Sequence, residues 1–371
     1  MKWIKDALYG FVKIETPVLS VIETKEFQRL RWIKQLGFTN LVYPSAVHTR
    51  FEHSIGCYYL ACKLCESLNL DCEELKIAAL LHDLGHLPFS HSIEKLVKDH
   101  EELTVEIVKN NLQETLESNG IDTKKVVKYI KGKSSLGKII SGELDLDRLD
   151  YLNRDSYYTG VAYGVIDYEA VIRSIERIGK HIKIKSKYLP VCESILIARY
   201  LMYSAVYYHR TVRIILAMIR RAFQEYAKTN FPRIEFLSDS EFIELLKQHN
   251  HSCFFIKRIL ERKLFKEVAR INTDEKIMLE FTDPNKCLEI EDQIAEELKI
   301  ERGKLLIHSI VPPKFSESKV MVSETNKTLE ETSPLVRGLN DAMKNHLWIG
   351  IYCYKPVKKQ LLNRVIRKYF C

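Results

Sequence analysis

The sequence predicts a mainly α-helical protein with a smaller C-terminal region of mixed helices and strands. Over residues 1–230, apolar side chains recur every three or four positions, which is the spacing of one buried helix face. After residues 228–236, short apolar runs typical of strands alternate with further helical segments. We therefore expect a helical domain over 1–230 and an α+β region over 231–371, with the boundary within 230–262.

Size and composition are those of a globular protein. The 371 residues suffice for one large core and more often form two domains, and 46% hydrophobic with 29% charged residues excludes a collagen-like or disordered chain. We find no apolar run of signal-peptide length at the N-terminus, and none of about 18–20 uncharged apolar residues that could span a membrane. The nine cysteines are odd in number and scattered, which favours a reducing compartment. We expect a cytoplasmic protein with no membrane partner.

The formal net charge of +8 suits an anionic ligand. It does not separate a nucleotide from a nucleic acid or an acidic protein. The lysines are spread along the chain and we recognise no nucleic-acid-binding motif, so nucleic-acid binding remains an unsupported alternative.

The elements of the helical domain follow from this periodicity. In chain order, the helical segments are 53–69, 72–83, 91–99, 102–117, 123–131, 145–157 and 192–228. Asp71 and Glu74 resemble a capping box that opens the second segment, and Gly85 would end it. Pro88 and Ser90 would start the third.

Strands are expected mainly in the C-terminal region. Alternation over 181–191 predicts a hairpin inserted between helices of the helical domain. Beyond it, the strand-like runs are 264–271, 304–310, 319–323 and 348–354. They alternate with helical patterns at 239–262, 285–299, 334–345 and 356–369. This order is typical of a small sheet with helices on one side.

Histidines gather in one part of the chain. Six of the twelve lie between residues 48 and 100, namely His48, His53, His82, His86, His91 and His100. His82 and Asp83 adjoin at the end of an apolar run, where burial is costly unless both groups are satisfied. The helical reading places His82 on the buried face and Asp83 about 100° around the axis. Both side chains could approach one metal ion, with further ligands from other elements.

Candidates for those further ligands lie both before and after His82 and Asp83 in the sequence. His53 begins the preceding helix, and the segment 142–156 places one polar face on the later helix, formed by Asp147, Asp150, Tyr151, Arg154 and Asp155. That face could lie in solvent or line a cavity, because Leu146, Leu149 and Leu152 pack the other side. Each histidine taken singly could be a hydrogen-bonded core residue. Together, His53, His82, Asp83 and Asp147 suit a divalent transition metal with open positions for water and substrate.

Five ordered blocks resemble the HD superfamily of metal-dependent phosphohydrolases. They are FQRLRWIKQLG (27–37), HTRFEHSIG (48–56), LLHDLGHLPFSHS (80–92), HEE (100–102) and LDLDRLDYLNRDSYYTG (144–160). They closely resemble the deoxynucleoside-triphosphate triphosphohydrolase branch, which includes the animal enzyme SAMHD and the bacterial dGTPases. The resemblance covers about residues 1–230 and preserves order and spacing. It implies an HD-domain helical core.

The resemblance also implies roles for individual residues. The metal ligands would be His53, His82, Asp83 and Asp147. The catalytic histidine would be His100, in a His-Glu motif, with His86 and His91 beside the scissile phosphate. Arg50 would bind phosphate, as would Arg148, which stands where many relatives have lysine. Tyr151 and Asp155 would hold the sugar and its 3′-hydroxyl, which Gln35 would also reach.

The implied function is metal-dependent hydrolysis of a dNTP, with dGTP as one candidate, to a deoxynucleoside and triphosphate. Two alternatives stay open: hydrolysis of another nucleotide, such as a guanosine polyphosphate or a nucleoside monophosphate, and a non-catalytic nucleotide or nucleic-acid sensor. The ion could be Mn, Fe, Zn, Ni, Co or Mg, since imidazole and carboxylate ligands accept them all. Because relatives assemble into oligomers, we expect a homo-oligomer.

Other features receive weaker interpretations. In relatives a later helix supplies further phosphate contacts, and its counterpart here, residues 203–213, offers His209, Arg210 and Arg213 as candidates. The CxxC spacing at 62–65 falls on a buried helix face, which favours small core residues over a metal or redox site.

Overall fold

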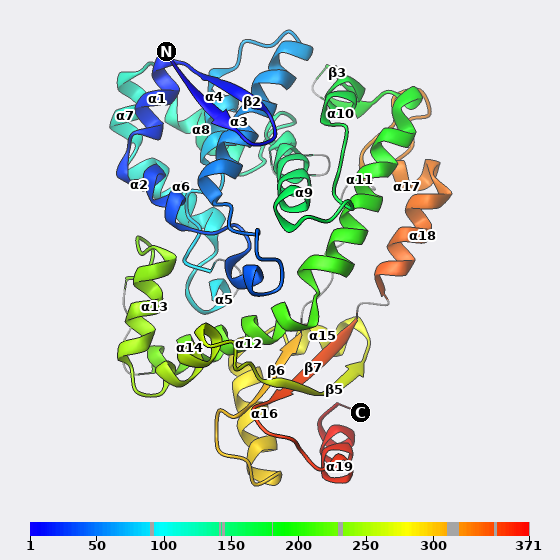
Figure 1. Ribbon diagram of the computed structural model, residues 1–371. Helices are drawn as coiled ribbons and strands as arrows, with labels where there is room; N and C mark the ends of the chain where they lie inside the picture. The colour runs from blue at the N-terminus through cyan, green and yellow to red at the C-terminus, as the bar shows by residue number, and fades with distance from the viewer. Residues whose placement is uncertain are drawn as a thin grey trace.

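The computed structural model describes residues 1–89, 93–140, 142, 145–179, 181–228, 233–309, 319–344 and 347–370. Most of these residues lie in helices (Figure 1), which confirms the predicted mainly α fold class.

The helical part occupies the upper half of Figure 1. Its elements are β1 (Lys2–Asp6), β2 (Gly10–Ile14), α1 (Thr16–Ile22), α2 (Lys25–Gln28), α3 (Arg50–Ser67), α4 (Glu73–Leu81), α5 (Glu94–Val97), α6 (His100–Asn110), α7 (Gln113–Ser118), α8 (Thr123–Ile130), α9 (Leu146–Thr159), α10 (Tyr168–Ser174), β3 (Ile175–Ile178), β4 (His181–Ile184), α11 (Leu189–Met202) and α12 (Arg210–Ala227). A single π-helical segment, Tyr203–Tyr207, joins α11 to α12.

The C-terminal part lies mainly below it in the same view and extends up its right side. It contains α13 (Asp239–Gln248), α14 (Ser252–Leu260), β5 (Lys266–Asn272), α15 (Glu275–Glu280), α16 (Pro284–Glu297), β6 (Leu305–Ser309), α17 (Leu329–Thr332), α18 (Pro334–Met343), β7 (Trp348–Cys353) and α19 (Lys359–Phe370). The strands form an antiparallel sheet in the order β5-β7-β6, with every residue of the central strand buried. The expected small sheet with helices is therefore present.

Two apolar clusters divide the described chain. The larger one runs through α3, α4, α9, α11 and α12 and also takes in α13, α14 and α18. The smaller one lies among α15, α16, α19 and the sheet. α12 is in contact with β6 and so joins the two parts. The division at residues 230–231 stays a prediction.

The N-terminal hairpin β1–β2 was not predicted. Its strands pair antiparallel from Lys2 opposite Ile14 to Asp6 opposite Gly10. Val12 and Ile14 are buried while Phe11 is exposed, which is the alternation of a strand with one covered face.

The hairpin predicted at 181–191 was misplaced by several residues. Its strands are β3 and β4, and the residues after β4 open α11 instead. Pro190 lies in the first turn of α11, where its missing N–H leaves no hydrogen bond unmade.

Three smaller predictions also need correction. Segment 319–323 forms isolated bridges, Ile184 with Val322 and Met321 with Thr328, instead of a strand. The N-cap of α4 is Cys72, so the predicted capping box of Asp71 does not form. α4 also ends at Leu81, before Gly85.

One helical run, Ser186–Tyr207, is long and apolar enough to cross a membrane by length and composition alone. This run was not predicted from the sequence. Cys192, Ile195 and Leu196 on it are buried, and α11 is in contact with α9 and α18. Core helices of globular proteins pass the same test, so the run is weak evidence for a membrane span.

Candidate functional site

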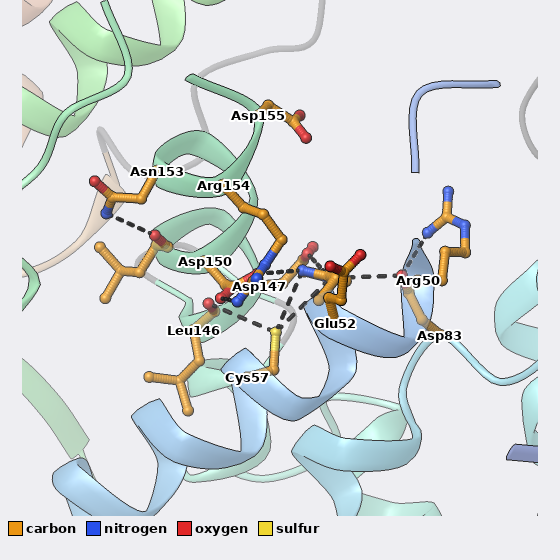
Figure 2. Close-up of polar contacts among 12 residues, drawn as sticks. Arg50, Glu52, Cys57, Asp83, Leu146, Asp147, Asp150, Asn153, Arg154 and Asp155 are labelled. Atoms are coloured by element: carbon orange, nitrogen blue, oxygen red, sulfur yellow. Dashed lines mark hydrogen bonds and ion pairs between the residues drawn. The ribbon is translucent and has the colours of Figure 1, made fainter. Parts of the chain in front are cut away.

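Four side chains from three helices meet at the centre of the helical part. His53 comes from the first turn of α3, His82 and Asp83 follow α4, and Asp147 lies in the first turn of α9. His53 Nε2 is 3.1 Å from Asp147 Oδ1 and 3.5 Å from Asp83 Oδ2. His82 Nε2 is 3.3 Å from Asp83 Oδ1 and 3.7 Å from Asp147 Oδ1. The four predicted metal ligands are therefore brought together, as Figure 2 shows for the two aspartates.

Local sequence explains two of these positions. Thr49 and Glu52 form a capping box that starts α3 one turn before His53. Asp145 caps α9 by accepting a hydrogen bond from the backbone N–H of Arg148, so Asp147 lies where the helix begins.

Both imidazoles present Nε2 to the carboxylates. His82 Nδ1 donates to the carbonyl of Ala79 at 2.8 Å, because a carbonyl can only accept. His53 Nδ1 donates in the same way to Asp150 Oδ2 at 2.8 Å. His82 Nε2 is buried and has no hydrogen-bond partner among the residues that the structure describes. An unpaired buried lone pair that faces carboxylates fits a metal ligand.

The carboxylates are held in their ionised form. Burial alone would raise the pKa of Asp83, but nearby His82, His86 and Arg50 lower it well below its usual value. Against the same effect of burial, the nearby imidazoles of His53 and His82 lower the pKa of Asp147. Two imidazoles and two carboxylates are a ligand set for a divalent transition metal, so the residues present fit such an ion.

Two of the three predicted catalytic histidines lie beside this centre. The rings of His86 and His100 stack with centroids 4.0 Å apart, and His86 Nε2 is 3.2 Å from Asp83 Oδ1. α6 approaches this closely because Gly85 has no side chain: a Cβ there would overlap the backbone of His100 and Thr104. His91 lies outside the described residues.

The two histidines differ in proton affinity. Burial and the charge of Arg50 lower the pKa of His86 well below its usual value. Burial also acts to lower the pKa of His100, but its ion pair with Glu94 raises it overall. His100 is therefore the one of the pair that more readily holds a proton.

The predicted phosphate-binding arginines occupy different surroundings. Arg50 forms an ion pair with Asp83 of the candidate metal cluster, as Figure 2 shows. Arg148 forms an ion pair with Asp145 at the start of α9. Arg199 of α11, which the sequence analysis did not single out, also lies near this face, since its charge acts on the Tyr151 hydroxyl together with that of Arg148.

The predicted sugar-binding residues lie further along α9. Asp155 Oδ1 is 2.7 Å from His48 Nε2, and Asp155 Oδ2 accepts a hydrogen bond of 2.6 Å from the Tyr207 hydroxyl. The ring of Tyr151 lies edge-on to that of Tyr207. Gln35 joins the group because its backbone N–H donates to the His48 carbonyl, and its Oε1 is buried without a hydrogen-bond partner in the described chain. On the polar face of α9, Asp150, Arg154 and Asp155 are buried and Asp147 and Tyr151 are half-buried, so this face does not lie in solvent.

The three candidates from residues 203–213, namely His209, Arg210 and Arg213, do not form a common group. The Arg213 guanidinium stacks on Trp348 and donates to the carbonyl oxygens of His308 and Trp348. His209 caps α12 by accepting from the N–H of Thr211, and Arg210 is exposed. Arg213 therefore attaches α12 to the sheet.

Several residues of the site were not predicted. Asp150 was assigned to the polar face but without a role, while Glu94, Tyr207 and Arg199 carried no recognised signal. His48 was noted only within the histidine cluster. All five act on a predicted residue from a distant part of the chain or from another element.

Fold and site together define a helical, metal-dependent hydrolase of phosphate esters. Comparisons with known proteins agree. Residues 50–155 match the model of the HD domain, and residues 166–371 match that of the HD associated region. The chain therefore belongs to the HD-domain phosphohydrolase family.

Known relatives extend the comparison. The chain is 39% identical to an uncharacterized protein of Methanocaldococcus jannaschii, over 99% of this chain and 82% of that one. It is 32% identical to the deoxynucleoside triphosphate triphosphohydrolase SAMHD1 homolog of Dictyostelium discoideum, over 60% of this chain and 49% of the relative. It thus spans about half the length of that enzyme.

Two solved structures share the whole fold. A hypothetical protein from Aquifex aeolicus superposes with a TM-score of 0.78 at 32% identity, covering 99% of both chains. A phosphohydrolase from Bacteroides thetaiotaomicron superposes with a TM-score of 0.76 at 26% identity, covering 96% of this chain and 100% of that one.

Proposed function

We propose that the protein hydrolyses dNTPs to deoxynucleosides and inorganic triphosphate. The observation that carries this proposal is the arrangement along α9. Asp147 of the metal centre and Asp155 of the sugar group lie on one helix face, eight residues or about 12 Å apart along the axis. An α-phosphate bound at the first and a deoxyribose bound at the second would fill that span. The similarity to proteins named deoxynucleoside triphosphate triphosphohydrolase supports the same substrate class.

The metal ligands would be His53, His82, Asp83 and Asp147. When bound, a divalent ion supplies Lewis-acid polarisation of a phosphoryl oxygen and an activated water. Its identity is left open because all these ligands accept several metals.

The chain's own groups provide the other parts of the reaction. Arg50 lies against the centre and offers positive charge to a phosphate. His100 pairs with Glu94 through Nδ1 and can hold a proton on Nε2 for the leaving oxygen, a contribution typically worth about 10²–10⁴ in rate. Neutral His86 stacks on His100 and limits how its ring can turn. Asp155 would accept the 3′-hydroxyl.

The test is to identify the products. Purified protein is incubated with each of the four dNTPs, with GTP, with a nucleoside monophosphate and with ppGpp, in Mn²⁺ or Mg²⁺, and products are separated by chromatography. Asp83→Ala is run beside it as the inactive control. Deoxynucleoside and triphosphate that appear only with the native protein would support the proposal.

Other results would replace it. Release of pyrophosphate from ppGpp, or of phosphate from a monophosphate, would assign the protein to another nucleotide hydrolase. Binding of dNTPs without turnover under either metal would favour a sensor. Light scattering of the same sample tests the expected homo-oligomer.

A further inference from the structure

A row of buried charges leads from the metal centre to the N-terminal hairpin. His53 Nδ1 donates to Asp150 Oδ2. Arg154 holds both oxygens of Asp150, through Nε at 2.8 Å and a terminal nitrogen at 2.9 Å (Figure 2). The other terminal nitrogen of Arg154 donates to Asp6 Oδ2 at 3.0 Å. The side chains of His53, Asp150 and Arg154 are fully buried, and that of Asp6 is 3% exposed. Three distant parts of the sequence therefore meet in one chain of contacts.

α3 can pack against this row of charges because residue 56 is a glycine. Gly56 lies one turn after His53, and a Cβ there would overlap Asp150 Oδ1 and press on the Arg154 guanidinium. Any other residue would displace the carboxylate that holds the His53 ring. The glycine is thus explained by the ion pair, since its backbone is ordinary helix.

The two carboxylate oxygens of Asp6 accept hydrogen bonds from different partners. Oδ1 accepts from the backbone N–H groups of Leu8 at 2.8 Å and Tyr9 at 3.1 Å, which closes the turn of the hairpin. Oδ2 is left for Arg154. Tyr9 also stacks on Tyr59 of α3 with ring centroids 4.6 Å apart, so the turn is fixed against the helix that carries His53.

We propose that Asp6, Gly56, Asp150 and Arg154 are positioning residues that set the orientation of His53 as a metal ligand. Asp150 holds the proton on Nδ1 and so leaves the Nε2 lone pair for the metal, Arg154 holds Asp150 with its rigid fork, and Asp6 holds Arg154. This inference rests on the proposed metal centre and adds the N-terminal hairpin to it. Loss of such supporting contacts typically weakens metal binding by about 10–100-fold.

The first test uses Asp6→Asn. Asparagine keeps Oδ1 for the turn but replaces the charged partner of Arg154. Isothermal titration of the metal-free protein with Mn²⁺ measures the affinity, and ¹⁵N chemical shifts of the His53 imidazole report which nitrogen carries the proton. We expect about tenfold weaker binding and changed His53 shifts, because Arg154 and Asp150 are held less firmly. The matched control is Lys13→Ala, which breaks an exposed ion pair of 2.8 Å with Glu15 on the same hairpin and should change neither readout.

The second test approaches the row from α3. Gly56→Ala leaves the hairpin intact and should weaken Mn²⁺ binding and disturb the His53 shifts in the same way. Gly338→Ala on α18 is its control, because a Cβ there meets no atom within 4 Å among the described residues. Circular dichroism verifies that each variant is folded, and Gly56→Ala decides the question if Asp6→Asn does not fold.

The outcomes are distinguishable. Native Mn²⁺ affinity and native His53 shifts in Asp6→Asn would overturn the inference and leave the proposed function untouched. If the native protein binds none of Mn²⁺, Fe²⁺, Zn²⁺, Ni²⁺, Co²⁺ and Mg²⁺, the proposed metal-dependent function fails. The inference then fails with it, because it concerns His53 as a metal ligand.

Discussion

Removal of the 3′-hydroxyl from the substrate should reduce turnover by an amount that the surroundings of Asp155 define. An ionised carboxylate has about four acceptor positions. His48 and Tyr207 occupy one on each oxygen, so positions remain for a substrate hydroxyl. A hydrogen bond to a charged group contributes about 1.5–3 kcal/mol. At about 1.36 kcal/mol per tenfold in rate, kcat/KM for a 2′,3′-dideoxynucleotide should fall about 13- to 160-fold.

Asp155→Asn provides the matching variant. A neutral hydrogen bond contributes about 0.5–1.5 kcal/mol, so the preference for the 3′-hydroxyl should shrink to about 2- to 13-fold. The assay is kcat/KM for dGTP and its dideoxy analogue with the native protein and the variant. Asp341→Asn, which alters an exposed aspartate, is the control and should keep the full preference.

One result would refute this reasoning. If the native protein hydrolyses both nucleotides with equal kcat/KM, Asp155 does not bind the sugar hydroxyl, and the second half of the span along α9 loses its assignment. Equal loss for both nucleotides in Asp155→Asn would assign the residue a structural role.

The remaining predictions concern contacts between secondary-structure elements around the site. Glu291→Ala leaves buried Arg220 and Arg221 without their shared carboxylate, so urea unfolding should show a loss of about 3–5 kcal/mol. Lys286→Ala breaks an exposed pair and should leave stability nearly unchanged, so equal losses in the two variants would contradict this prediction. Burial and the charges of Arg213 and Arg220 lower the pKa of His308 well below its unfolded value. Stability should therefore fall as pH drops below about 6.5, because the unfolded chain then binds a proton that the folded protein does not. Urea titrations of His308→Gln should show a smaller fall, and an unchanged pH dependence would refute this prediction. Gly85→Ala should push α6 and His100 away from the site. Turnover should then be abolished while Mn²⁺ binding, measured by titration, survives. Native turnover in this variant would show that the close contact of Gly85 with α6 is not needed.

Sequence patterns were most informative where one element decides the outcome. Helical spacing predicted α3, α8, α9 and α16 to within a few residues, because a buried face repeats along a single helix. Start and stop signals were less reliable: Asp71 does not cap α4 and the helix ends before Gly85, since packing against neighbouring elements outweighs these weak preferences. The hairpin at 175–184 was shifted because alternation continues past its second strand.

The sequence by itself determined the mainly α class and the set of residues able to bind a metal, since periodicity and the ordered blocks reveal both without knowledge of the fold. It could not determine what each polar side chain faces. The pairs of Asp6 with Arg154, His48 with Asp155, and Glu94 with His100 join separate elements. Burial leaves each of these charges dependent on one partner, and only the packing of helices and hairpin selects that partner.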